Sequence, residues 1–130
     1  MAALAFTATP VHAGQNDPRL ARLFVELKST QSPGWARTLE DEITHIWSQT
    51  PDTESQQLME KGLTLMAEDE DEAALKAFDA LVAHVPDFAE GWNRRATVEF
   101  LLGDYQASMA DIAHTLKLEP RHFGALAGLG

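Results

Sequence analysis

The sequence predicts an all-α protein built from antiparallel helix pairs that stack side by side. Apolar residues recur at helical spacing from Asp17 onward, and no stretch alternates in the manner of a β-strand. Prolines and N-cap residues divide the apolar segments into short helices joined by short loops. Side chains of the same type also recur with a period of 34 residues, which is typical of a helical repeat protein.

The first two helices are predicted over residues 18–30 and 33–49. Each follows an N-cap residue and a proline at the first helical position, in Asp17-Pro18 and Ser32-Pro33. The short connection between them favours an antiparallel arrangement. We interpret residues 17–53 as one unit, either a degenerate repeat or an N-terminal capping helix pair.

The remaining helices are predicted over residues 54–67, 71–84, 88–102 and 105–118, with a short one from about residue 122. Thr53 with Gln56, and Asp87 with Glu90, have the spacing of capping boxes at two of the helix starts. The dipeptide Gly103-Asp104 ends one helix and caps the next.

The 34-residue period links positions that have the same physical role. It pairs Pro86 with Pro120, Gly62 with Ala96, Ala74 with Ser108, and Phe78 with Ile112. Small residues at these positions let two helices cross closely, and the large apolar residues fill the space beside them. Because a single helix pair cannot bury its apolar face, such pairs stack on one another.

Residues 89–122 resemble a tetratricopeptide (TPR) repeat of bacterial type. The resemblance rests on Trp92, the turn Leu102-Gly103-Asp104-Tyr105 and the closing Pro120. Residues 54–88 resemble the repeat less closely, because the acidic run 68–72 replaces this turn. Residues 123–130 resemble the start of a further repeat, so we expect a fragment of a longer array. The resemblance implies a right-handed α-solenoid.

The TPR resemblance also implies a concave groove lined by the first helix of each pair. The residues expected to line it and bind a partner are Met59, Leu63, Met66, Asn93, Arg94, Thr97 and Phe100. The alternative is that Met59 and Met66 belong to the core and that Arg94 is a solvated charge. Within the second repeat, Arg95 is expected to form a structural ion pair with Asp111.

Composition excludes several other classes of function. The net charge is −10, of which −9 falls in residues 52–90, and this argues against a nucleic-acid partner. The chain has no cysteine and no apolar run long enough to span a membrane. We find no catalytic, cofactor or metal motif, and we interpret the acidic run 68–72 as a solvated loop.

The N-terminal segment, residues 1–16, is predicted to be either signal-like or disordered. Residues 1–13 are small and apolar, and Val11-His12-Ala13 fits a signal-peptidase site with cleavage before Gly14. This reading predicts a periplasmic protein. The alternative is a disordered tail on a cytoplasmic protein.

These observations together predict a non-catalytic scaffold or adaptor that holds a peptide or a partner helix in the concave groove. The first alternative is a structural module that self-associates through its open C-terminal face, residues 123–130. The second alternative is an enzyme or a cofactor binder, which the absence of a recognisable motif disfavours.

Overall fold

The computed structural model describes residues 14–129 and confirms the all-α fold. This part of the chain contains one short 3-10 helix, η1 (Gly14–Asn16), seven α-helices and no strand. The α-helices are α1 (Arg19–Ser29), α2 (Pro33–Trp47), α3 (Thr53–Ala67), α4 (Asp71–His84), α5 (Ala89–Leu101), α6 (Tyr105–Leu118) and α7 (Phe123–Gly128). The signal-like residues 1–13 lie outside the described residues, so export stays a prediction.

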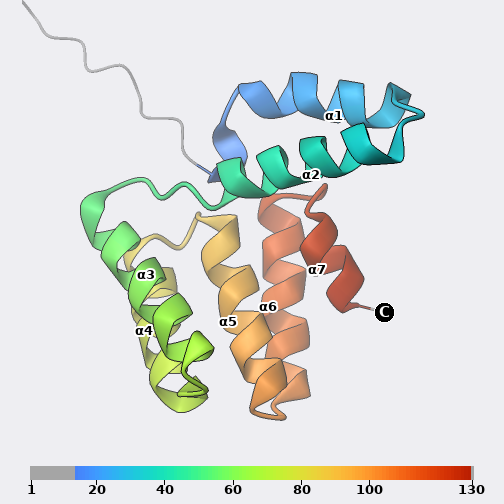
Figure 1. Ribbon diagram of the computed structural model, residues 1–130. Coiled ribbons are helices and arrows are strands. Elements are labelled where there is room, and N and C mark those ends of the chain that lie inside the picture. The colour runs from blue at the N-terminus through green and yellow to red at the C-terminus, as the bar shows by residue number, and fades with distance from the viewer. Residues whose placement is uncertain (1–13, 130) are drawn as a thin grey trace, which may run out of the picture.

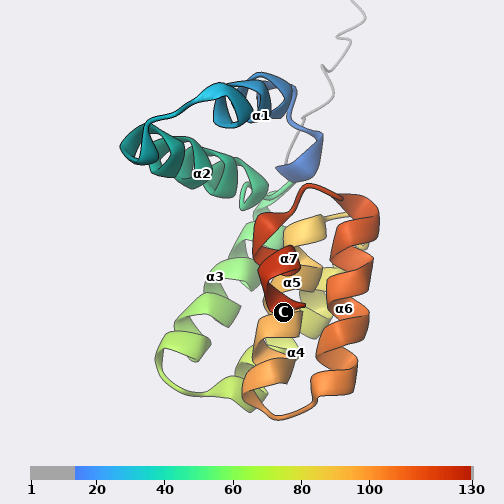
Figure 2. The same cartoon turned by 90° about the vertical axis from the view of Figure 1, so that its right-hand side faces the viewer.

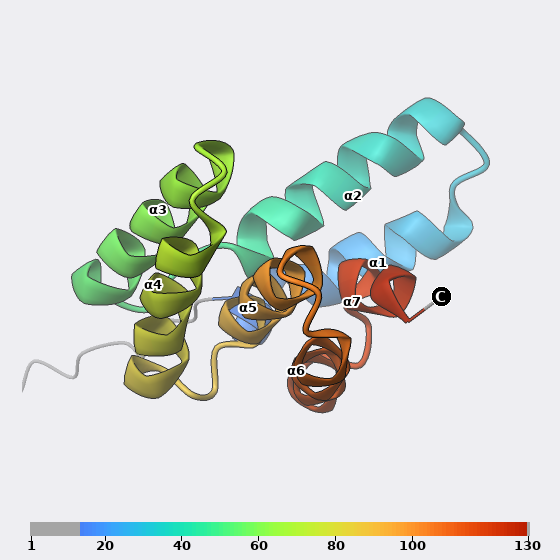
Figure 3. The ribbon, with the colours of Figure 1, turned by 90° about the horizontal axis from the view of Figure 1, so that it is seen from below.

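Helices α3 to α7 form a layered array in which each helix packs against the next one along the chain (Figure 1). The antiparallel pairs α3/α4 and α5/α6 lie side by side, and α7 lies beside α6 (Figure 3). No helix within residues 14–129 is long and apolar enough to cross a bilayer.

The core of the first pair depends on one close helix crossing. Phe78 of α4 is fully buried, and its ring lies directly against the backbone of Gly62 on α3. A Cβ atom at Gly62 would lie 2.4 Å from Cζ of Phe78, which is too close for any larger residue without repacking. The small residue expected from the 34-residue period is therefore required by the packing of the two helices.

The turns within the two pairs have the same backbone shape despite their different sequences. Gly103 has φ +81°, and Asp69, which lies 34 residues earlier, has φ +59°. In both turns the next residue donates its N–H to a carbonyl of the preceding helix, from Glu70 to Leu65 and from Asp104 to Glu99. Aspartate is among the residues that tolerate this left-handed region, so an acidic turn replaces the glycine turn.

Two of the predicted helix caps are wrong. The side chain of Asp52, and not that of Thr53, caps α3 by accepting the N–H of Ser55 at 2.7 Å. At the start of α5 no local side chain forms a cap, so Asp87 does not have the predicted role. Instead Gln15 of η1 accepts the N–H of Ala89 at 3.1 Å, so a segment distant in sequence supplies this cap.

Helices α1 and α2 form a cross-hairpin that lies over one end of the array (Figures 1 and 2). Its core is a buried apolar cluster that includes Trp47 of α2 and extends to Phe123 of α7. The rings of Trp47 and Phe123 are 4.8 Å apart between centroids. The cross-hairpin therefore contacts the start of α7, and it does not continue the stack in front of α3 as a preceding repeat would.

Candidate binding groove

A pocket of about 450 Å³ lies between α5, α6 and α7. Its lining carries no charged side chain and consists of Asn93, Ala96, Thr97, Phe100, Ser108, Ile112, Gly124, Ala127, Gly128 and Leu129. Figure 2 looks onto α7 in front of α5 and beside α6, the three helices that form its walls. We call this pocket the groove.

Small residues create the space and hold the walls together. Ser108 of α6 donates its hydroxyl to the carbonyl of Ala96 on α5 at 2.7 Å, and both residues are buried. On the other wall, a Cβ atom at Gly128 would lie 2.9 Å from Cδ1 of Ile112. The walls therefore meet closely at the floor of the groove, while its rim is apolar, with Phe100 59% exposed.

The structure divides the seven residues predicted to line the groove. Asn93, Thr97 and Phe100 of α5 line it. Leu63 is exposed on α3 but is not part of this pocket, and Met66 packs against the core of the first pair. Met59 is only 5% exposed and lies in that core, so its prediction as a partner contact is wrong. A longer residue at the groove position of the first repeat has folded inward.

Arg94 does not face the groove as an isolated cation. Its Nε lies 2.7 Å from Oε1 of Glu90, one turn earlier on α5, and Glu90 is only 3% exposed. The second oxygen of Glu90 lies 2.7 Å from Nε2 of His122, which is also buried. This polar cluster beside the groove was not predicted, because Glu90 fitted a capping box and residue 122 has no sequence motif.

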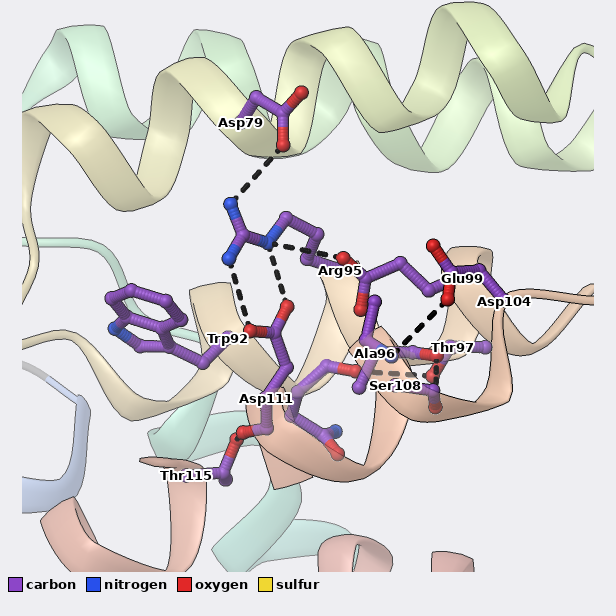
Figure 4. Close-up of polar contacts among 12 residues, drawn as sticks. Asp79, Trp92, Arg95, Ala96, Thr97, Glu99, Asp104, Ser108, Asp111 and Thr115 are labelled. Atoms are coloured by element: carbon purple, nitrogen blue, oxygen red, sulfur yellow. Dashed lines mark hydrogen bonds and ion pairs between the residues drawn. The ribbon is translucent and has the colours of Figure 1, made fainter. Parts of the chain in front are cut away.

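The predicted pair between Arg95 and Asp111 is present inside the second repeat (Figure 4). The guanidinium donates from Nε and Nη2 to the two carboxylate oxygens, at 2.6 and 2.9 Å. Its Nη1 reaches Asp79 of α4 at 3.1 Å. Arg95 therefore joins three consecutive helices, α4, α5 and α6, and the ion pair belongs to the structure of the array.

Glu99 lies next to this pair and has an unusual protonation. Burial, followed by the negative charge of Asp111, raises the pKa of Glu99 to about 7. Arg95 Nε is 3.6 Å from its Oε1, a weaker contact than the one Arg95 makes with Asp111. One guanidinium thus serves two buried carboxyl groups, and the proton on Glu99 relieves the repulsion between them.

We expect Glu99→Gln to remove part of the pH dependence of stability. The folded state binds a proton that the unfolded state releases near pH 4.5, so wild-type stability falls as the pH rises from about 4.5 to 7. The contribution is about 1–3 kcal/mol. Urea denaturation at pH 5 and pH 8 should show a smaller difference for Glu99→Gln than for wild type. The exposed control Glu60→Gln should behave as wild type, and equal pH responses of all three proteins would contradict the assignment.

The described residues offer no evident site for a metal ion. Within residues 14–129, no three histidine, aspartate or glutamate side chains are grouped closely enough to ligate one. His84 contacts Asp52 and Glu54 on α3, where Asp52 already caps the helix. These contacts are accounted for by helix packing.

Comparison with known proteins adds one relative. A TPR repeat-containing protein of Rhizobium etli is 42% identical to this chain over 111 residues. The match includes 85% of this chain and 54% of the relative, so the chain spans about half of the relative's length. No protein-family model matches the chain, and no solved structure matches it.

Proposed function

Because the chain is a tetratricopeptide-repeat protein, a family of protein-interaction modules, we propose that it binds a peptide or a partner helix in the groove without catalysis. The observation that carries this proposal is the uncharged pocket between α5, α6 and α7 with its exposed apolar rim. Pockets of this size with few polar groups commonly bind ligands. Apolar side chains of a partner would fill the pocket and be removed from water there.

The polar atoms of the groove can orient such a ligand. Asn93 has both amide donors and an acceptor, and its Nδ2 makes only a long hydrogen bond of 3.4 Å to Glu90. Thr97 donates its hydroxyl to the carbonyl of Asn93 at 3.1 Å, which leaves the hydroxyl oxygen able to accept. Together these groups could pair with the backbone of a bound segment while Phe100 contacts its apolar side chains.

A display selection tests this proposal, followed by affinity measurements on the selected peptides. Random 12-residue peptides would be selected on the immobilised chain, and their dissociation constants measured by fluorescence anisotropy. The double variant Thr97→Arg/Phe100→Glu places charges in the groove at two exposed positions. We expect its affinity for the selected peptides to fall at least about tenfold, the size of a hot-spot loss.

The matched control is Trp35→Glu, which adds the same charge at another exposed aromatic position on α2, outside the pocket lining. It should leave the dissociation constants within about twofold, a change typical of surface substitutions. All variants must keep the helical circular dichroism and melting temperature of wild type. Peptides that bind the groove variant and wild type equally would contradict binding in the groove.

Self-association is a second candidate function. Met109, Leu126 and Leu129 are each about half or more exposed near the C-terminal end of the array. A second copy could bury these side chains and leave the groove without a separate ligand. Sedimentation velocity over a range of protein concentrations distinguishes the two functions, because only self-association predicts a sedimentation coefficient that rises with concentration.

A further inference from the structure

His122 connects three elements that meet beside the groove. Its ring stacks on Trp47 of the cross-hairpin, with centroids 4.3 Å apart and planes inclined by 13°. Its Nε2 lies 2.7 Å from Glu90 on α5, one helix of the groove. Its Nδ1 accepts the N–H of Ala125 at 3.1 Å and so caps α7, another helix of the groove.

These contacts define the protonation state of the imidazole. A nitrogen that accepts an amide N–H cannot carry a proton, so Nδ1 is unprotonated. The neutral ring then carries its proton on Nε2 and donates it to the Glu90 carboxylate. If His122 takes up a second proton, it can keep the bond to Glu90, but Nδ1 becomes a donor facing the N–H of Ala125.

The charged groups facing His122 come in compensating pairs. Glu90 on α5 is paired with Arg94, and Glu119, just before α7, is paired with Arg121 at 2.8 Å. Both carboxylates favour an imidazolium, and the two arginines oppose it. From the cross-hairpin the imidazole is faced by the uncharged ring of Trp47. The loss on protonation is therefore concentrated on the one contact that needs a neutral ring, the cap of α7.

Helix α7 depends on this cap because it has only six residues. A helix of that length is not stable without tertiary contacts and caps. Gly124, Ala127 and Gly128 of α7 line the groove, so a change in the order of α7 changes the groove itself. Ala125, whose N–H bonds to His122, is buried with only 1% of its surface exposed.

We propose that His122 is a pH-sensitive latch for the groove, in which protonation at Nδ1 removes the cap of α7 and loosens this wall. The proposal rests on the proposed function, because it concerns regulation of the same groove. Histidine is the side chain suited to such a switch in mildly acidic conditions. Ligand affinity would then be highest when His122 is neutral.

Nuclear magnetic resonance of the ¹⁵N-labelled full chain, without any peptide, tests the latch directly. Imidazole ¹⁵N shifts report protonation of Nδ1 between pH 8 and pH 5, and hydrogen exchange reports protection of the Ala125 and Leu126 amides. We expect protection, corrected for the intrinsic exchange rate, to fall about fivefold to tenfold as Nδ1 is protonated, as expected for losing a helix cap. Amides in α5 and α6 should keep their protection.

Two variants complete the test. In His122→Asn the amide oxygen can cap α7 but does not titrate, so protection of α7 should not depend on pH. His114→Asn removes the histidine that contacts Trp92 on α5 and should leave the α7 response intact. If His122 stays neutral down to pH 5, or is protonated with no loss of α7 protection, the latch is refuted. Because no ligand is used, this result is independent of whether the groove binds peptides.

Discussion

Replacing Trp47 by alanine is expected to lower the free energy of unfolding by about 3–5 kcal/mol, the range for removing a large buried aromatic side chain. Trp47 is 2% exposed and contacts the rings of Phe24, His122 and Phe123. It thus belongs at once to the core of the cross-hairpin and to its junction with the repeats. Urea denaturation followed by circular dichroism measures the change.

The variant should also separate the cross-hairpin from the repeats. Limited proteolysis in residues 48–52 should become faster, while α3 to α6 stay protected, because their cores do not include Trp47. The control Trp35→Ala removes an indole that is 48% exposed and should cost less than about 0.5 kcal/mol. A loss from Trp47→Ala no larger than that of the control would show that the junction is not held by this ring.

Replacing Asp111 by asparagine is expected to cost about 3 kcal/mol, in the range for breaking a buried ion pair. Asp111 has a side chain only 7% exposed and accepts two hydrogen bonds from Arg95. The amide keeps the shape of the side chain but removes its charge and one acceptor. Arg95 is then left partly buried with Glu99, which holds a proton near neutral pH, as its nearest alternative.

Asp79→Asn is the matched control for this variant. It makes the same chemical change to another partner of the same guanidinium, but the Asp79 side chain is 54% exposed. An exposed pair contributes at most about 1 kcal/mol, so the control should cost much less than Asp111→Asn. Equal losses in thermal and urea denaturation would show that burial does not give the Asp111 pair its strength.

Repetition in the sequence explains why the repeats were predictable. The period of 34 residues relates Gly62 to Ala96 and Phe78 to Ile112, and the structure uses these positions for close helix crossings and the residues beside them. The pair between Arg95 and Asp111 is also local to one repeat, so the antiparallel helices bring it together. Such contacts depend on neighbouring helices alone and can be read from periodicity.

The groove was predictable only in part. Three of its predicted residues lie on α5 with a spacing of three or four, so they share one helix face. Met59 fitted the same pattern but lies in the core, because a residue's exposure depends on how tightly the next helix packs over it. Periodicity assigns a face to a side chain and does not measure the space beside it.

The sequence by itself determined the seven helices, their antiparallel pairing and the turns between them, because apolar spacing, caps and short loops act locally. Only the tertiary structure decided where the cross-hairpin lies, how Gln15 caps α5, and that His122 joins Glu90 to α7. Residues 15 and 90 are far from their partners along the chain, and no local propensity encodes such contacts. They form because folding brings buried polar groups together, where each must find a partner.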